Sequence, residues 1–139
     1  MKKIILMSGL MLIALYSLAT TPTVAVQKAF EKKFPNSTKL KWRKENPTEW
    51  EAEFTINKEN ISANFAIDGT WLETEREIKV AELPEAVRDA IQKQYPGWKI
   101  TEADKTETAK TGTIYEADLK KGKEKNEVAY LENGMPVKE

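Results

Sequence analysis

Apolar and polar residues alternate without interruption over residues 49–56. A period of two is typical of a β-strand with one buried and one solvent-exposed face, because successive side chains point to opposite sides of the strand. The segment 114–119 repeats the core of this stretch, with residues 115–119 matching the residue types of 50–54. The pattern therefore predicts two similar strands, at 49–56 and 113–120, around which the rest of the chain is arranged.

Two segments with apolar residues at helical spacing predict amphipathic helices. The first starts near Thr21–Pro22, since threonine is a good N-cap and proline suits the first helical position. It ends before Pro35, because a residue that precedes proline is pushed out of the α region. The second starts near Leu83–Pro84 and ends at Pro96–Gly97. Each helix is expected to bury one apolar stripe, formed by Val26, Ala29, Phe30 and Phe34 in the first and by Leu83, Val87, Ala90, Ile91 and Tyr95 in the second.

Shorter alternating segments predict the remaining strands, and turn-forming residues separate them. Asp68–Gly69 and Asn133–Gly134 are typical of two-residue hairpin turns, whose residues need positive φ. The charged, threonine-rich segment 105–112 is expected to be a loop. The further strands are expected at 39–43, 61–67, 71–78, 98–100, 126–131 and 135–137.

The two halves of the chain, about 21–80 and 82–138, match each other. The Phe-Pro pair that ends the first helix matches the Tyr-Pro pair that ends the second at an offset of 61 residues, and Trp50 matches Tyr115 at an offset of 65. A four-residue insertion in the predicted loop at 105–112 accounts for the change of the offset from 61 to 65 residues. The repeat predicts an α+β fold, a tandem repeat of one helix plus about four antiparallel strands. Both helices are expected on one face of a shared sheet, over a common core.

Composition excludes several classes of function. The chain has 22 Lys and Arg against 22 Asp and Glu, so it carries no basic excess for binding nucleic acid. It has no cysteine and no histidine, which excludes disulfides, thiolate and imidazole metal ligands, and histidine-dependent catalysis. The remaining residue types show no nucleophile–base pair or metal-ligand set. We therefore expect no enzymatic activity, no metal and no cofactor.

The N-terminus has the pattern of an export signal. Two lysines precede a largely apolar run over residues 4–18 that is short for a membrane span. We predict a signal peptide over residues 1–19, cleaved after Ala19, with cleavage after Ala25 as the second choice and an uncleaved membrane anchor as the alternative. The remaining domain, residues 20–139, would then be periplasmic or secreted, without a stable membrane span.

Four motifs follow one another in a fixed order along the chain. A helix ends in Phe-Pro or Tyr-Pro, [Trp/Tyr]-Glu-Ala-[Glu/Asp]-[Phe/Leu] follows, an aromatic residue precedes Asp-Gly or Asn-Gly, and Leu-Pro opens the next helix. This order, over about residues 21–138, resembles the PepSY-like, beta-lactamase-inhibitor-like family. The resemblance implies tandem units of one helix packed on a four-stranded sheet, in small exported envelope proteins with a binding or inhibitory role. This chain lacks the cysteines of the disulfide-bonded secreted β-lactamase inhibitors.

A two-residue turn at Asp68–Gly69 would place Ala66 opposite Trp71. Opposed residues share a face, so Trp71 is expected on the open face of the sheet, which is the face away from the helices. Pro136 is expected beside Leu131 on this face by the same reasoning. Aromatic residues are common interface anchors. We hypothesise that the open face binds a partner through Trp71, Asn64, Glu51, Glu53, Glu116, Asp118 and Leu131.

Two structural alternatives stay open at this surface. Trp71 can instead pack under its neighbouring loop or against lysine side chains. The carboxylates can form a solvated strand face, since they lack the residue spacing of a calcium-binding loop.

The sequence therefore predicts a non-enzymatic exported binding module, such as an inhibitor or a sensor. Its expected partner is a protein or peptide of the cell envelope, engaged through the open face. The alternative is a structural envelope protein that self-associates through its sheet edges.

Overall fold

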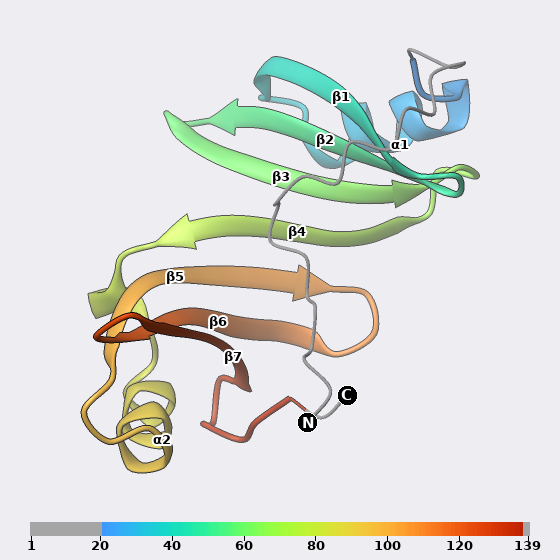
Figure 1. Cartoon of the computed structure of the whole chain (residues 1–139). Coiled ribbons are helices and arrows are strands. Elements are labelled where there is room, and N and C mark those ends of the chain that lie inside the picture. The colour runs from blue at the N-terminus through green and yellow to red at the C-terminus, as the bar shows by residue number, and fades with distance from the viewer. Residues whose placement is uncertain (1–20, 138–139) are drawn as a thin grey trace.

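A computed structural model describes residues 21–137, and the predicted signal peptide over 1–19 lies outside them. The described chain forms one seven-stranded antiparallel sheet whose strands lie side by side in chain order (Figure 1). This is an α+β fold, as the sequence predicts. The elements are α1 (Val24–Lys33), β1 (Thr38–Asn46), β2 (Glu49–Ile56), β3 (Glu59–Ala66), β4 (Trp71–Ile78), the 3₁₀ helix η1 (Val80–Glu82), α2 (Glu85–Gln94), β5 (Lys99–Thr108), β6 (Gly112–Lys121) and β7 (Glu124–Leu131).

Both helices end in the same way. Phe34 and Tyr95 are the C-cap residues, and their backbone N–H groups donate to the carbonyl oxygens four residues earlier, at 2.8 and 2.7 Å. The proline that follows each C-cap stops the helix there, because it restricts the residue before it to non-helical angles. The predicted C-terminal ends are therefore confirmed. The first helix begins slightly later than expected, at Val24, where the Thr23 hydroxyl caps it.

The strand register shows that α1 and α2 cover the same face of the sheet, as predicted. Phe54 of β2 packs against Phe30 of α1, with ring centroids 5.0 Å apart. The Tyr130 hydroxyl of β7 donates to Gln94 of α2 at 2.8 Å. Directly opposed side chains share a face, and one such row joins Phe54, Ile61, Arg76, Lys105, Tyr115 and Tyr130. We call this side the helix face and the other side the open face.

The helix face carries two hydrophobic cores, so the expectation of one common core is wrong. By register, the polar side chains of Thr74, Arg76, Lys105 and Glu107 on β4 and β5 lie between them. Each helix therefore packs on its own cluster of strand residues. The α1 core contains Val26, Phe30, Trp50, Ala52, Phe54, Ala63 and Phe65, and the α2 core contains Ile78, Leu83, Val87, Ile91, Ala103, Tyr115, Ala117, Leu119, Val128 and Tyr130.

Strand β5 is longer than predicted and joins the two halves. The segment 105–112, expected as a loop, continues β5 to Thr108 and pairs with both β4 and β6. The β-branched side chains of Thr106 and Thr108 suit an extended backbone, and pairing on both sides outweighs the polar character of the segment. Residues 135–137, expected as a further strand, form only an isolated bridge to Tyr130.

Two glycines hold hairpin turns against the helices. Gly69 has a φ of +91° and Gly134 a φ of +79°. A Cβ atom on Gly69 would lie 2.8 Å from the carbonyl oxygen of Ala25 in α1, and one on Gly134 would lie 2.5 Å from that of Ala86 in α2. Glycine accommodates both the positive φ and the close approach. Each turn therefore docks on the N-terminal turn of a helix.

We expect Gly69→Ala to destabilise the protein more than Gly122→Ala does. A Cβ at Gly69 would overlap the Ala25 carbonyl group, whereas a Cβ at Gly122 meets nothing within 4 Å. Gly122 has a φ of +62°, so its substitution introduces left-handed backbone strain alone, about 1–2 kcal/mol. Overpacking should add roughly 1–3 kcal/mol at Gly69. Urea unfolding of the two variants measures the difference, and equal losses of stability would contradict the docking of this turn on α1.

Candidate functional site

The open face of the sheet is dominated by carboxylates. Both helices lie on the other face (Figure 1). Alternate residues of each strand project from the open face, because successive side chains point to opposite sides of a strand. The cross-strand register places eleven acidic residues on it, against the basic Lys41 and Arg43 of β1 and Lys99, Lys120 and Lys125 at one end of β5 to β7. The acidic residues are Glu49, Glu51, Glu53, Glu73, Glu75, Glu77, Glu102, Asp104, Glu116, Asp118 and Glu127, and the polar residues among them include Ser62, Asn64 and Thr106.

In the N-terminal half, Arg43 of β1 neutralises two of these carboxylates. Its Nε donates to Glu51 Oε2 at 2.9 Å, and its Nη2 also contacts this oxygen and lies 3.4 Å from Glu53 Oε1. The hydrogen bond to Glu51 raises the pKa of the Arg43 guanidinium above its usual value. Lys41 lies opposite Glu53 in the same strand pair, so basic and acidic residues alternate across this part of the face.

In the C-terminal half, carboxylates lie opposite carboxylates over the middle of the strands, and lysines lie opposite lysines at one end, as Lys99–Lys120 and Lys120–Lys125. Like charges that are directly opposed on adjacent strands destabilise a sheet. The ion pairs between side chains in residues 21–137 do not include any of these groups. The opposed pairs are Glu77–Asp104, Asp104–Glu116, Glu102–Asp118 and Asp118–Glu127.

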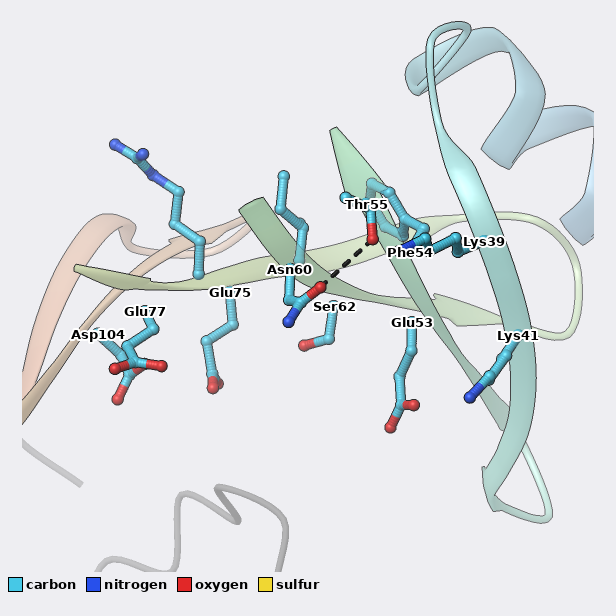
Figure 2. Close-up of a pocket in the computed structure, with 12 residues that line it drawn as sticks. Lys39, Lys41, Glu53, Phe54, Thr55, Asn60, Ser62, Glu75, Glu77 and Asp104 are labelled. Carbon is cyan, nitrogen blue, oxygen red and sulfur yellow. Dashed lines mark hydrogen bonds between the residues drawn. The ribbon is translucent and has the colours of Figure 1, made fainter. Parts of the chain in front are cut away.

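A hollow of about 490 Å³ lies where β1 to β5 present part of this face. Most of the side chains that line it are charged or polar. It therefore differs from the mostly apolar clefts that enclose small molecules. Figure 2 shows five of its side chains on the same side of the sheet: Glu53, Ser62, Glu75, Glu77 and Asp104.

Burial and mutual repulsion raise the pKa of several of these carboxyl groups. Burial is the larger cause for Glu75, whose pKa rises to about 8, and repulsion from Glu116 and Asp104 adds to it. Burial is also the main reason why the pKa of Glu116 rises to about 7 and that of Asp104 to about 6. Thr106 Oγ1 and Glu116 Oε1, both buried, have no hydrogen-bond partner within the described chain. This part of the face therefore retains protons near neutral pH, where ordinary carboxyl groups have lost them.

Most residues proposed from the sequence as a partner surface do lie on the open face. The register places one group of them on β2 and β3 and another on β6 and β7. The two groups lie on opposite sides of the β4–β5 junction. They are Glu51, Glu53 and Asn64 in the first group and Glu116, Asp118 and Leu131 in the second.

Trp71 is the exception, and its predicted position on the open face is wrong. A β-bulge interrupts the β3–β4 register, so Trp71 is paired with Phe65 on the helix face. Its Nε1 donates to Thr74 Oγ1 at 2.9 Å, and Lys33 Nζ lies 3.8 Å from its ring centroid. The alternative, in which Trp71 packs against a lysine, therefore agrees with the structure.

The predicted position of Pro136 on the open face is also wrong. Pro136 bridges to Tyr130, which lies on the helix face. In both hairpins the connection is longer than two residues. The backbone N–H groups of Ala66 and Leu131 each donate to a carbonyl oxygen four residues later, at 2.8 Å.

Sequence reasoning misses Glu75, Glu102 and Asp104 as members of this surface. It assigns part of β5 to a loop and so does not place β5 beside β4. The segment 73–77 does carry a usable signal, since every second residue in it is acidic, which is the pattern of a strand with one acidic face.

Two further features of the described chain bear on function. Among residues 21–137, no helix has the length and apolar character needed to cross a membrane. Within that same range, no three acidic, histidine or cysteine residues are grouped as the ligands of a metal ion would be.

The family model described as putative beta-lactamase-inhibitor-like, PepSY-like matches residues 48–135. The chain belongs to this family. The resemblance inferred from the order of its motifs is thereby confirmed. The matched residues contain β2 to β7 and with them most of the open face.

Solved structures share the fold of this PepSY-like protein. A BLIP-like protein from Bacteroides fragilis is 25% identical, with a TM-score of 0.74, over 85% of this chain and 84% of that chain. A DUF2874 family protein from Bacteroides ovatus is 22% identical, with a TM-score of 0.76, over 85% and 86% of the two chains. A protein from Bacteroides eggerthii described as periplasmic is 17% identical, with a TM-score of 0.76, over 85% and 87%. Among curated proteins, none matches the chain.

We expect the free energy of unfolding of this PepSY-like protein to fall as pH rises from about 4.5 to about 8. A carboxyl group whose pKa is higher in the folded than in the unfolded protein binds more protons when folded, so raising the pH favours unfolding across that window. For Glu75 the window runs from the usual 4.5 to about 8. Glu75→Gln keeps the side chain uncharged. This variant should have a flatter pH dependence of its free energy of unfolding than the wild type. Near pH 8 it should be more stable than the wild type by about 1 kcal/mol, which corresponds to less than one pKa unit.

Urea unfolding at several pH values across this window measures both effects. Glu31→Gln is the matched control, because Glu31 is an exposed carboxylate on α1 and its substitution should leave the trend unchanged. Stability that rises with pH in the wild type, or an unaltered slope in Glu75→Gln, would show that burial and repulsion do not raise the pKa of Glu75.

Proposed function

We propose that this protein is a non-enzymatic exported binding module that engages a protein or peptide of the cell envelope through the open face. The observation that supports this best is the charge of that face. Its carboxylates form cross-strand rows, and within residues 21–137 the ion pairs that involve these rows are those of Arg43 with Glu51 and Glu53. Residues that lower the stability of a fold in this way are commonly functional.

The shape of the open face favours a protein or peptide over a small molecule as the partner. Its hollow is lined mostly by charged and polar groups, whereas small-molecule sites are mostly apolar with a few polar groups. A broad charged surface attracts and orients a complementary protein surface. An inhibitory or sensory role is part of the proposal by analogy with the BLIP-like neighbour, whose fold is similar.

We also propose that the two halves of the chain, about 21–80 and 82–138, are copies of one helix-and-sheet unit. The glycine contacts support this. Gly69 docks on Ala25, and Gly134 docks on Ala86. Gly134 follows Gly69 by 65 residues and Ala86 follows Ala25 by 61, which are the two offsets seen in the sequence.

Export is the third part of the proposal. Residues 1–19 have the lysine-then-apolar pattern of a signal peptide. A protein of similar fold from Bacteroides eggerthii is described as periplasmic. The mature domain would therefore lie in the periplasm or outside the cell.

Self-association through sheet edges is the alternative, and the edge strand β1 argues against it. This strand carries the basic residues Lys39, Lys41, Arg43 and Lys44. Its register is interrupted near Lys39, which has a φ of +56°. Lysines and irregular backbone on an edge strand hinder pairing with a strand of another chain.

Site-specific photo-cross-linking in cells that export the protein tests this proposal. A photoreactive residue at Ser62 or Asn64 lies on the open face, whereas one at Glu31 or Asp89 lies on an exposed helix surface. We expect a defined partner to be captured from the open face and not from the helices. Equal capture from all positions would contradict the role of the open face. Capture of a second copy of the chain from Lys44 on β1 would instead favour self-association.

A further inference from the structure

Corresponding strand pairs in the two halves carry different charge patterns on the open face. The cross-strand pairs of β1 and β2 are Lys41–Glu53 and Arg43–Glu51. The cross-strand pairs of β5 and β6 are Glu102–Asp118 and Asp104–Glu116. The residues correspond one by one, at an offset of 61 for β1 and β5 and of 65 for β2 and β6. Strand β5 thus has acidic residues at the positions where β1 has basic ones.

The acidic pairs lack the compensation that Arg43 provides in the first half. Opposed Cβ atoms on adjacent strands are about 5 Å apart, so like charges there repel each other at short range. Arg43 forms ion pairs with both of its acidic neighbours. The four carboxylates of the β5–β6 pairs form none with the side chains of residues 21–137. A partner that supplied basic side chains here would complete the pattern of the first half.

A buried carboxylate oxygen without a donor lies inside this acidic cluster. Glu116 exposes 3% of its surface, and its Oε1 has no hydrogen-bond partner within the described residues. Thr106 lies on the neighbouring strand and exposes 1% of its surface. Its Oγ1 also has no hydrogen-bond partner within the described residues. A buried acceptor without a donor is unfavourable. The isolated protein therefore carries an uncompensated polar cost inside the acidic cluster.

The spacing of the cluster fits basic side chains better than a metal ion. Neighbouring strands are about 4.8 Å apart, and alternate residues of one strand are about 7 Å apart. Within the described chain no three acidic side chains are grouped as metal ligands. A guanidinium carries forked donors that can contact two carboxylates at once. Arg43 already does so between Glu51 and Glu53.

We propose that a lysine- and arginine-rich segment of the partner protein binds across β5 and β6. Its cationic side chains lie between Asp104 and Glu116 and between Glu102 and Asp118. An arginine of the partner then has the role that Arg43 has in the first half of the sheet. This inference rests on the proposed function, because it identifies the chemistry of the partner that the open face binds.

Calorimetric titration of the mature protein with a short synthetic arginine-rich peptide tests the inference. The solution should contain about 0.15 M salt, where exposed charges more than about 8 Å apart are largely screened. The charge-swap variant Glu102→Lys/Asp104→Arg copies the pattern of β1 into β5. We expect the wild type to bind the peptide and the charge-swap variant to bind it roughly tenfold or more weakly. A glutamate-rich peptide of the same length should not bind the wild type.

The matched control is Glu31→Lys/Asp89→Arg. It makes the same change in net charge on exposed helix surfaces, and we expect it to keep the wild-type affinity. Equal affinities of the wild type, the charge-swap variant and this control would overturn the inference, because the peptide would then not depend on the acidic pairs of β5 and β6. The absence of measurable binding by the wild type would overturn it as well.

A neutral variant, Asp104→Asn/Glu116→Gln, keeps the test decisive if the charge-swap variant does not fold. It removes two carboxylate charges at nearly constant size, and we expect it to weaken binding of the same peptide. It should also raise the midpoint of thermal unfolding, because it removes two like-charge pairs, Glu77–Asp104 and Asp104–Glu116. Unchanged peptide affinity in a folded neutral variant would overturn the inference.

The outcomes also separate this inference from the proposed function. If photo-cross-linking from the open face captures a partner equally well in the wild type and in the charge-swap variant, the inference alone is overturned. If the open face captures no partner in either protein, the proposed function fails. Self-association of the wild type that the charge swap abolishes would overturn the inference by identifying a second copy of this chain as the occupant.

Discussion

The antiparallel pairing of β4 with β5 is the interaction on which the rest of this structure depends. The two hydrophobic cores do not merge, because a polar band on the helix face lies between them. The halves are held together by the ladder that runs from the Glu73–Thr108 pair to the Ile78–Ala103 pair. Ile78 belongs to the α2 core although it lies on β4, so apolar packing anchors one end of this ladder. Without the ladder there would be two small sheets and no continuous open face.

The same pairing determines the electrostatics of the open face. It brings the acidic side chains of β4 next to those of β5, and repulsion from Asp104 and Glu116 contributes to the raised pKa of Glu75. Backbone hydrogen bonds and the two cores therefore hold carboxylates closer together than their charges favour. The first half of the sheet relieves this repulsion with Arg43, whereas the second half has acidic residues at the corresponding positions. This asymmetry is the main reason to propose a binding role for the open face, since similarity of fold to other family members does not establish a function.

Much of the fold follows from local patterns in the sequence, whereas the junction of the halves does not. Strict alternation over 49–56 and 115–120 identifies the central strands, and a proline after each C-cap fixes where the helices end. The continuation of β5 to Thr108 is not apparent, because polar, threonine-rich residues occur in loops as well as in strands that gain partners on both sides. Trp71 is misplaced because a bulge shifts the register, and such a shift moves side chains to the opposite face. The acidic composition of the site could therefore be predicted, but not its full membership.

Native-state hydrogen exchange tests most directly whether the two halves form one sheet. The informative amides are those in β4 and β5 that bond across the junction, compared with amides in β2 and β6 at the centre of each half. We expect the junction amides to exchange as slowly as those of the two centres, because a continuous sheet opens as one cooperative unit. Fast exchange at the junction, with slow exchange in β2 and β6, would show that the halves separate in the native state and would contradict a continuous open face.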